Sequence, residues 1–377
     1  MTPHQALFSL SLVLVIACGG SSPTDSPDTA PPGADAQPIE DATPLPTGGI
    51  AELFTKEAFD SFFPHANGGV GPDGEPYNYA NFLRAAAEFP AFGNTGDTET
   101  RLREIAALLG HVVQETATSS PTIPRPEGGL FFLQELGCES GCPAYSNSCT
   151  PPDLASQGVA GARANWPGWA YPCSASASYH GRGAHQLSYN YNYGLFSRYM
   201  FDGDATVLLN DPDRLLRDGR LAFLSAIWFW MTPRSPKPSM HAVITGSWTP
   251  APEDVAAGIL PGFGATINII NPIECGGPIE DARAQGRIDA YERLCNLLGV
   301  SPRDNLGCAT MAPFSVQRDD IPAFYLEQDW AGGCTCNPVT YETPFLAGIP
   351  GDAERCADSM RVANQPPFFL EAACTGG

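Results

Sequence analysis

Apolar residues recur at helical spacing along residues 101–116 and again along residues 285–298. In the first segment they are Leu102, Ile105, Leu108, Leu109, Val112 and Val113. In the second they are Ile288, Tyr291, Leu294, Cys295 and Leu298, and Gly299 is the expected helix end. A repeat of three and four residues is that of an amphipathic helix with one buried face. We therefore predict two such helices.

Residues 221–230 are apolar on every side, which predicts a helix in the middle of the core. They are too few to span a bilayer. Thr55 and Asn78 each precede a short segment with inward-facing apolar residues, and both are residue types that cap helix N-termini. Strand and helix patterns do not alternate along the chain. The predicted fold class is therefore mainly α, with short hairpins at most.

The N-terminus has the pattern of a lipoprotein signal peptide. The apolar run 6–16 is too short for a membrane span and leads into VIAC, with Ala17 before Cys18, as in a bacterial lipobox. We expect Cys18 to be lipidated and the exported protein to be anchored to the cell envelope, at the outer membrane or the cell surface. An ordinary cleaved signal peptide, giving a secreted protein, is the alternative. Residues 19–49 are rich in Pro, Gly, Ser and Asp, which predicts a disordered linker.

The net charge of the chain narrows the classes of partner. The formal net charge of −21 argues against nucleic acid, and against any membrane contact beyond the lipid anchor, because both need a basic face. A neutral or cationic polymer fits better as the substrate.

The 12 cysteines of an exported chain are read as disulfides, although a four-cysteine zinc site is the alternative for those between residues 138 and 173. We expect no metal and no cofactor.

Residues 179–194, YHGRGAHQLSYNYNYG, place neutral hydrogen-bonding side chains next to aromatic rings. Sugar hydroxyls need donors and acceptors, and sugar faces lie well on aromatic rings. The stretch thus suits a sugar polymer, with Gln186, Tyr191 and Asn192 as candidate binding residues. A surface loop rich in Tyr and Asn is the alternative.

Two charged residues fall on the apolar faces of the predicted helices. Glu115 lies on the buried side of its helix, where lost hydration favours the protonated carboxyl that a general acid needs. The alternative is a helix-end glutamate that turns out to solvent. Arg287 lies on or beside the inner face of the second helix, and a guanidinium there needs a carboxylate partner.

Several long motifs resemble glycoside hydrolase family 19, the chitinases best known from plants. They are GRG, QLS and NYNYG within residues 179–194, WFWMTPRSPKPSMHAVITGSWTP from Trp228, PGFGATINIIN from Pro261 and ECG from Glu274. The resemblance covers about residues 50–308, which we take as the catalytic domain. It implies a two-lobed, lysozyme-like fold with a central cleft. It also implies hydrolysis of β-1,4-linked N-acetylglucosamine polymers without a metal or a cofactor.

The resemblance also assigns catalytic roles. VVQET falls where the family has His-Glu-Thr, so Glu115 is the general acid, and Gln114 replaces the histidine. FLQELG resembles the segment that carries the second carboxylate, so Glu135 is the general base, and Leu133 and Leu136 replace cations. Ser188 matches the serine that helps to hold the attacking water. That role is chemically reasonable, because a serine without an adjacent base is no nucleophile.

Further residues are assigned in the same way. Lys237 resembles a residue at the cleft rim, and Asn271 matches an asparagine that contacts the sugar N-acetyl group. Glu274 resembles the partner of Arg287, and this pair is expected to touch Glu115.

The implied disulfides are Cys149–Cys173 and Cys275–Cys308; Cys138 and Cys142 would then form an extra bridge, and Cys295 would remain an unpaired buried thiol. Residues 309–377 lie beyond the resemblance and form a cysteine-containing extension, which would either bind polysaccharide or brace the domain.

We therefore predict a monomeric endochitinase that cleaves chitin or chitin oligosaccharides by an inverting mechanism with two carboxylates. Two other functions stay open at the level of sequence. One is a peptidoglycan hydrolase, since some members of the family in phages cleave cell walls. The other is a catalytically inactive chitin-binding lipoprotein. Gln114 and the altered surroundings of Glu135 support this alternative.

Overall fold

The structure is a computed structural model that describes residues 44–142, 171, 173–174, 176–234 and 236–315, together with strands β1 (Tyr325–Gln328) and β2 (Cys336–Val339). The chain divides into two compact units, Met1–Asp41 and Ala42–Gly377, and every described residue belongs to the second. The predicted lipobox Cys18, most of the predicted linker and Cys149 lie outside the described residues.

The first three helices are short, and side-chain caps set the starts of the second and the third. They are α1 (Ile50–Leu53), α2 (Lys56–Phe62) and α3 (Tyr79–Ala87). Thr55 Oγ1 accepts the Ala58 N–H at 3.3 Å, and Asn78 Oδ1 accepts the Asn81 N–H at 2.9 Å, so both predicted caps are present. The segment between α2 and α3 contains the 3-10 helix η1 (Asn67–Gly69).

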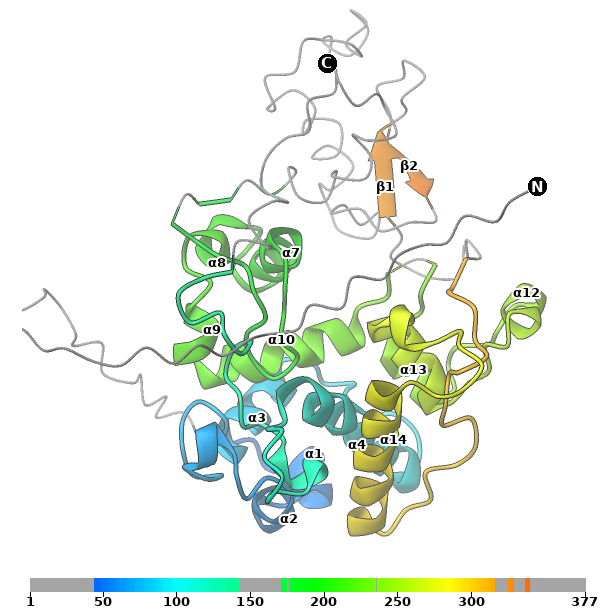
Figure 1. Ribbon diagram of the computed structural model, residues 1–377, viewed down its shortest axis with the longest axis horizontal. Coiled ribbons are helices and arrows are strands. Elements are labelled where there is room, and N and C mark those ends of the chain that lie inside the picture. Colours follow the sequence, from blue (N-terminus) through cyan, green and yellow to red (C-terminus); the bar gives the residue numbers. More distant parts are fainter. Residues whose placement is uncertain are drawn as a thin grey trace, which may run out of the picture. The chain divides into compact units, whose positions relative to one another are not determined.

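Helices α4 (Thr98–Thr116) and α14 (Ala282–Leu298) are the two predicted amphipathic helices, and they pack along each other (Figure 1). Both begin before their apolar pattern does, because Asp97 and Asp281 cap them by accepting the N–H groups of Thr100 and Arg283, each at 2.8 Å. Helix α14 ends at Gly299, whose φ of 69° is the left-handed conformation that glycine adopts readily.

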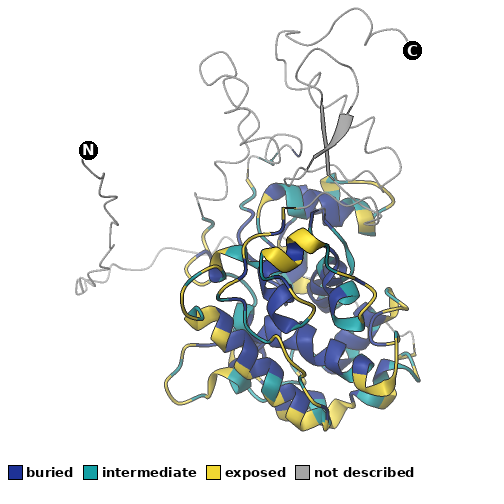
Figure 2. Cartoon of the chain, turned by 90° about the vertical axis from the view of Figure 1, so that its right-hand side faces the viewer, coloured by how far each residue is buried: buried dark blue, intermediate teal, exposed yellow. Residues whose placement is uncertain are grey.

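Helix α10 (Gly219–Met231) is the predicted core helix. Nearly all its residues are buried, and it packs against α3, α4, the short α9 (Arg214–Arg217) and α11 (Met240–Thr245). Figure 2 shows the buried residues concentrated in the inner helices and the exposed ones on the outer turns. The remaining helical elements are η2 (Arg125–Gly128), α7 (Asn190–Met200), α8 (Thr206–Asn210), α12 (Pro252–Ala256), α13 (Phe263–Ile270) and η5 (Pro272–Glu274).

Strands β1 and β2 form an antiparallel pair in which Tyr325 faces Val339 and Gln328 faces Cys336. The predicted class, mainly α with short hairpins at most, is confirmed for the described part of the chain. No helix within that part is both long and apolar enough to cross a bilayer.

The structure contains the disulfides Cys138–Cys142 and Cys275–Cys308, and Cys295 is a buried free thiol. Cys173 is disulfide-bonded too, but its predicted partner Cys149 is outside the described residues, so that pairing stays a prediction.

Candidate active site

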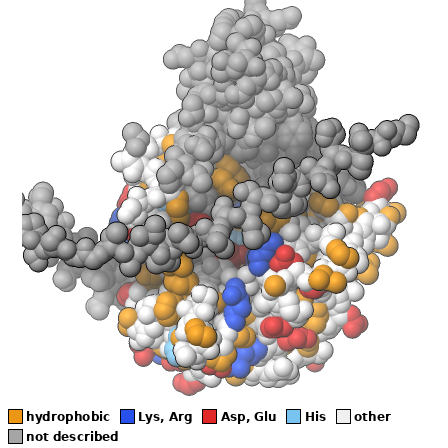
Figure 3. Space-filling model, in the orientation of Figure 1, with side chains coloured by type: hydrophobic (Ala, Val, Ile, Leu, Met, Phe, Trp, Pro, Cys, Tyr) orange, Lys and Arg blue, Asp and Glu red, His pale blue; other side chains and the backbone are white. Residues whose placement is uncertain are grey.

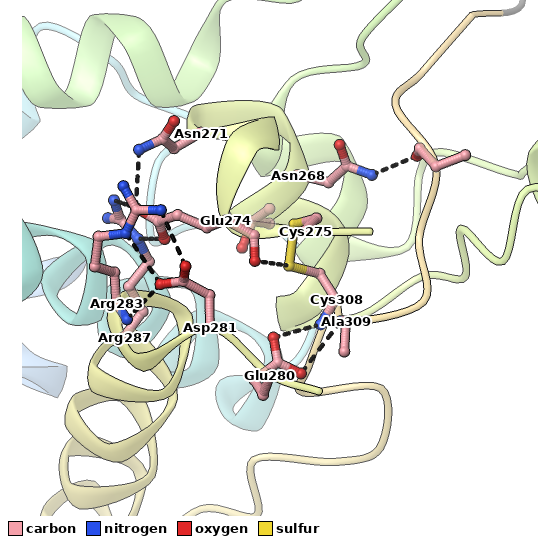
Figure 4. The surroundings of a disulfide bond; sticks show 12 residues. Asn268, Asn271, Glu274, Cys275, Glu280, Asp281, Arg283, Arg287, Cys308 and Ala309 are labelled. Carbon is pink, nitrogen blue, oxygen red and sulfur yellow. Dashed lines mark hydrogen bonds and ion pairs between the residues drawn. A yellow bond between two sulfur atoms is a disulfide. The ribbon is translucent and has the colours of Figure 1, made fainter. Parts of the chain in front are cut away.

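Glu115, at the end of α4, belongs to a network with two other charged residues. Its Oε1 accepts Arg287 Nη2 at 2.5 Å. Arg287 also donates from Nε and Nη2 to the two carboxylate oxygens of Glu274, at 2.9 and 3.0 Å (Figure 4). Arg287 and Glu274 are each 1 % exposed, and Glu115 is 23 % exposed. The structure therefore brings together the three residues expected to touch, each from a different element.

This contact changes one expectation. The helix pattern predicted an apolar environment for Glu115, whereas the structure places a guanidinium on its carboxylate. The reason is that α14 presents Arg287, rather than an apolar residue, to this part of α4. Burial lowers and the charges of Glu115 and Glu274 raise the pKa of Arg287, and the net direction is upward.

A buried histidine extends the network on the other side of Arg287. His111 lies four residues before Glu115 on α4, and its Nδ1 accepts from Arg287 Nη1 at 3.4 Å. Its Nε2 must then carry the proton and donate to Thr266 Oγ1 at 2.9 Å, while Thr266 donates to the Phe263 carbonyl. Burial, followed by the charge of Arg287, holds the pKa of His111 well below its ordinary value. His111 is thus a neutral hydrogen-bond acceptor that helps to fix the position of the Arg287 guanidinium.

Asn271, which lies between α13 and η5, supports the same network. Its Nδ2 donates to Glu274 Oε1 at 2.8 Å, so its amide is oriented with the donor end toward the carboxylate (Figure 4). The nearby Ile273 is 73 % exposed and therefore does not pack into the site.

Glu135 is held by the backbone of residues 179–194. Its N–H donates to the Gly181 carbonyl at 2.9 Å, and the Gly181 N–H donates to Glu135 Oε2 at 3.2 Å. On either side of this contact, Gly183 N–H donates to the Leu133 carbonyl at 3.0 Å, and His180 Nε2 bonds Gln134 Oε1 at 3.0 Å. Glu135 is half-buried and fixed on residues 180–183.

Gln186 and Ser188 follow directly in the same stretch. Gln186 Nε2 donates to the Gly183 carbonyl at 3.0 Å, and Ser188 Oγ donates to the Gln186 carbonyl at 2.9 Å. Gly181 lies against Gln186, because a Cβ at Gly181 would be 2.9 Å from Gln186 Oε1. Gln186 and Tyr189 have φ values of 49° and 70°, a strained conformation for residues with a side chain. Such strain persists only where surrounding hydrogen bonds fix the backbone, as they do here.

The other predicted sugar-binding residues lie at the start of α7 and after α10. Asn192 Nδ2 donates to the Ser188 carbonyl at 2.9 Å, and Arg234 Nη1 donates to Asn192 Oδ1 at 2.8 Å. The Tyr191 ring stacks on Tyr189 with centroids 5.7 Å apart. Lys237 pairs through its backbone with Arg234.

Sequence reasoning did not single out His111, His185 or Arg234. His111 had a usable signal, because a spacing of four residues puts it on the same helix face as Glu115. His185 and Arg234 pack against the Phe229 ring at 4.6 Å each, and their pattern in the sequence gave no such signal. No group of three or more potential metal ligands occurs among the described residues.

Comparison with known proteins decides the family. A family described as "Chitinase class I", glycoside hydrolase family 19, matches residues 53–308. The chain belongs to glycoside hydrolase family 19. It is 43 % identical over 275 residues to "Endochitinase CH25" of Brassica napus, an alignment that covers 72 % of this chain and 77 % of that protein. It is 40 % identical over 301 residues to "Basic endochitinase B" of Arabidopsis thaliana, with 79 % and 81 % covered.

The fold of this family 19 member is similar to that of a solved bacterial structure. Chitinase C from Streptomyces griseus HUT6037 aligns with a TM-score of 0.50 and 27 % identity, over 70 % of this chain and 82 % of that one. The chain is thus a family 19 glycoside hydrolase, with the mainly helical fold seen in that chitinase.

Proposed function

We propose that this family 19 enzyme hydrolyses β-1,4 bonds inside chitin chains and chitin oligosaccharides. The observation that carries the proposal is the separate anchoring of two carboxylates, Glu115 on Arg287 and Glu135 on Gly181. Both lie in motifs of the family, and residues 179–194 hold the second one. The similar plant proteins named above are endochitinases, which supports chitin as the substrate.

Glu115 acts as the general acid in this proposal. Arg287 is bonded to Glu274 through two hydrogen bonds, so its charge stays compensated when Glu115 takes up a proton. A sugar bound over the 23 % exposed Glu115 removes water from the carboxylate and favours that protonation. Glu115 then gives the proton to the glycosidic oxygen as the bond from that oxygen to C1 breaks.

Glu135 acts as the general base. It takes a proton from a water molecule, whose oxygen attacks C1 from the face opposite to the leaving group. Ser188 already donates its hydroxyl proton to the Gln186 carbonyl, so its oxygen remains an acceptor for that water. Room for the water requires the two carboxyl groups to stand about 6.5–9.5 Å apart, the separation of inverting enzymes, rather than about 5–5.5 Å.

The purified protein incubated with chitin hexamer and with peptidoglycan tests the substrate. The proposal expects internal cleavage of the hexamer into shorter oligomers and no release of fragments from peptidoglycan. Cleavage of peptidoglycan alone would assign the chain to cell-wall hydrolysis. Binding of the hexamer without cleavage would assign it to the inactive chitin-binding class.

We also propose that Cys18 is lipidated, so that the enzyme works as a monomer tethered to the cell envelope by residues 19–49. The lipobox pattern and the polar composition of the linker support this. Mass spectrometry of the mature N-terminus should find a diacylglyceryl-modified Cys18. A free N-terminal residue at another position would reject the anchor and leave the hydrolase proposal untouched.

A further inference from the structure

A second arginine lies next to the general acid, held by the residue that precedes it. Gln114 stands where the family has a histidine, and its Oε1 accepts Arg125 Nε at 3.2 Å and Nη2 at 2.9 Å. Arg125 Nη2 also donates to the Gln114 backbone carbonyl at 3.3 Å. The residue that directly precedes Glu115 in the chain therefore holds this guanidinium through both its side chain and its backbone.

Arg125 begins η2, a 3-10 helix that packs against both α4 and α14. Gly286, next to Arg287 on α14, leaves space for the contact, because a Cβ there would lie 2.6 Å from Gln114 Oε1 and 3.2 Å from Arg125 Nε. Any larger residue would push the amide and the guanidinium apart. The contact thus has room on α14, an acceptor on α4 and a donor on η2.

Arg125 belongs electrostatically to the network of the acid. Burial and the charge of Arg287 lower the pKa of Arg125, whereas the charges of Glu115 and Glu274 raise it. Among the described residues Arg125 forms no ion pair of its own. Part of its side chain is exposed, so solvent and salt screen the interaction.

We propose that Gln114 and Arg125 form a positioning pair for the general acid, in which Gln114 holds a second, permanent positive charge beside Glu115. The inference rests on the proposed function, because it assigns the pair a role only if Glu115 is the acid. Removal of that charge is expected to change the pH above which the enzyme loses activity. A histidine at position 114 would instead offer a group that titrates near neutral pH.

The charged and titratable groups around Glu115 come from every neighbouring element. They are Arg287 of α14, Glu274 of η5, Arg125 of η2 and the neutral His111 of α4 itself. Glu127, also on η2, is paired with Arg293 of α14 at 2.8 Å on the surface. Arg287 is buried, whereas Arg125 is exposed, so Arg125 is the cation whose removal is expected to disturb the fold less.

The test is the pH profile of kcat/KM on a chitin oligomer for Arg125→Gln, with Arg293→Gln as the matched control. Both variants remove one positive charge and one tie of η2, but only Arg125 is held beside Glu115. We expect the alkaline limb of Arg125→Gln to move to higher pH by roughly 0.5–1 unit, the effect of one charge several ångströms away in partly solvated surroundings. Arg293→Gln and Arg125→Lys should keep the limb of the unmodified enzyme.

One further variant and a change of salt concentration sharpen the test. Gln114→Met, which removes the acceptor but keeps the length of the side chain, should move the limb in the same direction by less. The difference between Arg125→Gln and the unmodified enzyme should shrink at high salt.

Three results would overturn the pair. They are an unmoved limb in Arg125→Gln, an equal shift in Arg293→Gln, and a rise of KM at every pH with no shift, which would make Arg125 a direct sugar contact. Each leaves the hydrolase proposal intact, because it is seen in an enzyme that cleaves chitin. If the unmodified protein cleaves no chitin, the proposed function fails, and the role of the pair fails with it.

Discussion

Arg287 is the residue on which the acid side of the site depends. Its 1 % exposed guanidinium contacts two carboxylates and one imidazole, which come from two different elements, α4 and η5. A buried guanidinium is stable only with such compensation. Because Glu274 compensates it, Glu115 is left available for the proton transfer that we propose. The same contact fixes the direction in which the Glu115 carboxyl points.

Replacing Glu115 by Gln should abolish turnover, because an amide of the same shape cannot give a proton to the leaving oxygen. Loss of an acid or base typically costs about 10²–10⁴-fold in rate. Ser188→Ala should slow the reaction less, since water can still reach Glu135. The check is kcat on chitin hexamer for both variants, with unfolding curves to show that each is folded. A slower Ser188→Ala than Glu115→Gln would reverse the assigned roles.

His185 should make the protein sensitive to acid. It is 6 % exposed, and burial, with the charges of Arg287 and Arg234, lowers its pKa to about 3. The folded state thus favours the neutral ring, so its contribution to stability is complete above the unfolded pKa of about 6.5 and is lost as pH falls toward 3. The total is on the order of 4 kcal/mol.

Denaturant unfolding at pH 7, 5 and 4 checks this. In His185→Leu the free energy of unfolding should fall less between pH 7 and pH 4 than in the unmodified protein. Some slope should remain, because burial lowers the pKa of His111 as well. An identical fall in both proteins would contradict a buried neutral His185.

At the residue scale, sequence reasoning worked where one face of a helix decided the answer. Arg287 on an inner face required a carboxylate, and the structure provides Glu274 and Glu115. It failed where the partner comes from a distant segment: the contacts of Gln114 with Arg125, and of Arg234 with Asn192, depend on how separate elements pack. No local pattern encodes such packing.

At the scale of elements, the crossing of α4 and α14 places the acid against its partner. The helices are in close contact at Gly110, where a Cβ would lie 3.1 Å from Tyr291 Cβ and 3.2 Å from its Cα and N. Those neighbours include backbone atoms, which cannot move aside alone. Glu115 and Arg287 lie about one turn from this contact, toward the site.

Gly110→Val should therefore force the two helices apart. We expect a loss of about 1–3 kcal/mol in the free energy of unfolding, the usual cost of overpacking a core. We also expect a fall in kcat, because the contact of Glu115 with Arg287 lengthens. Ala256→Val, which adds apolar volume at an exposed helix end, is the control and should change neither. Unchanged stability in Gly110→Val would show that the helices are not in close contact.

The disulfide Cys275–Cys308 closes a loop with a sequence separation of 33 that contains α14. Glu280 braces the same loop by accepting the N–H groups of Cys308 and Ala309 at 3.1 and 3.3 Å (Figure 4). Cys275→Ser with Cys308→Ser should lower the free energy of unfolding by about 3–4 kcal/mol in the chain-entropy model. Denaturant titration measures it, and reduction of the unmodified protein should give a similar loss. A loss below 1 kcal/mol would contradict a structural role.

Most element types could be predicted from periodicity and caps, because helices α4 and α14 each bury a defined face and α10 is apolar on every side. The 3-10 helix η1 and the left-handed residues Gln186 and Tyr189 could not. Their conformations are imposed by hydrogen bonds to distant segments, such as Tyr189 N–H to the Tyr179 carbonyl at 2.8 Å. Residues 179–194 were thus identified by composition and not by their shape.

At the scale of the whole molecule, the charge suits an uncharged substrate. The formal net charge is −21, and Figure 3 shows Lys and Arg side chains of the described residues in small groups beside acidic ones on the visible face. The buried cation of the site is matched by carboxylates from the same network. Such a protein repels anionic polymers and tolerates chitin, which carries no charge.

The stereochemistry of the first product tests the central claim most directly. If Glu115 protonates the leaving oxygen while Glu135 directs water to the opposite face of C1, the β-linked polymer must give an α-anomer. Time-resolved proton NMR of chitin hexamer hydrolysis, recorded before the anomers equilibrate, distinguishes the two outcomes. The account predicts that the α-anomer appears first at the newly formed reducing end. An initial excess of the β-anomer would contradict the two-carboxylate inverting mechanism.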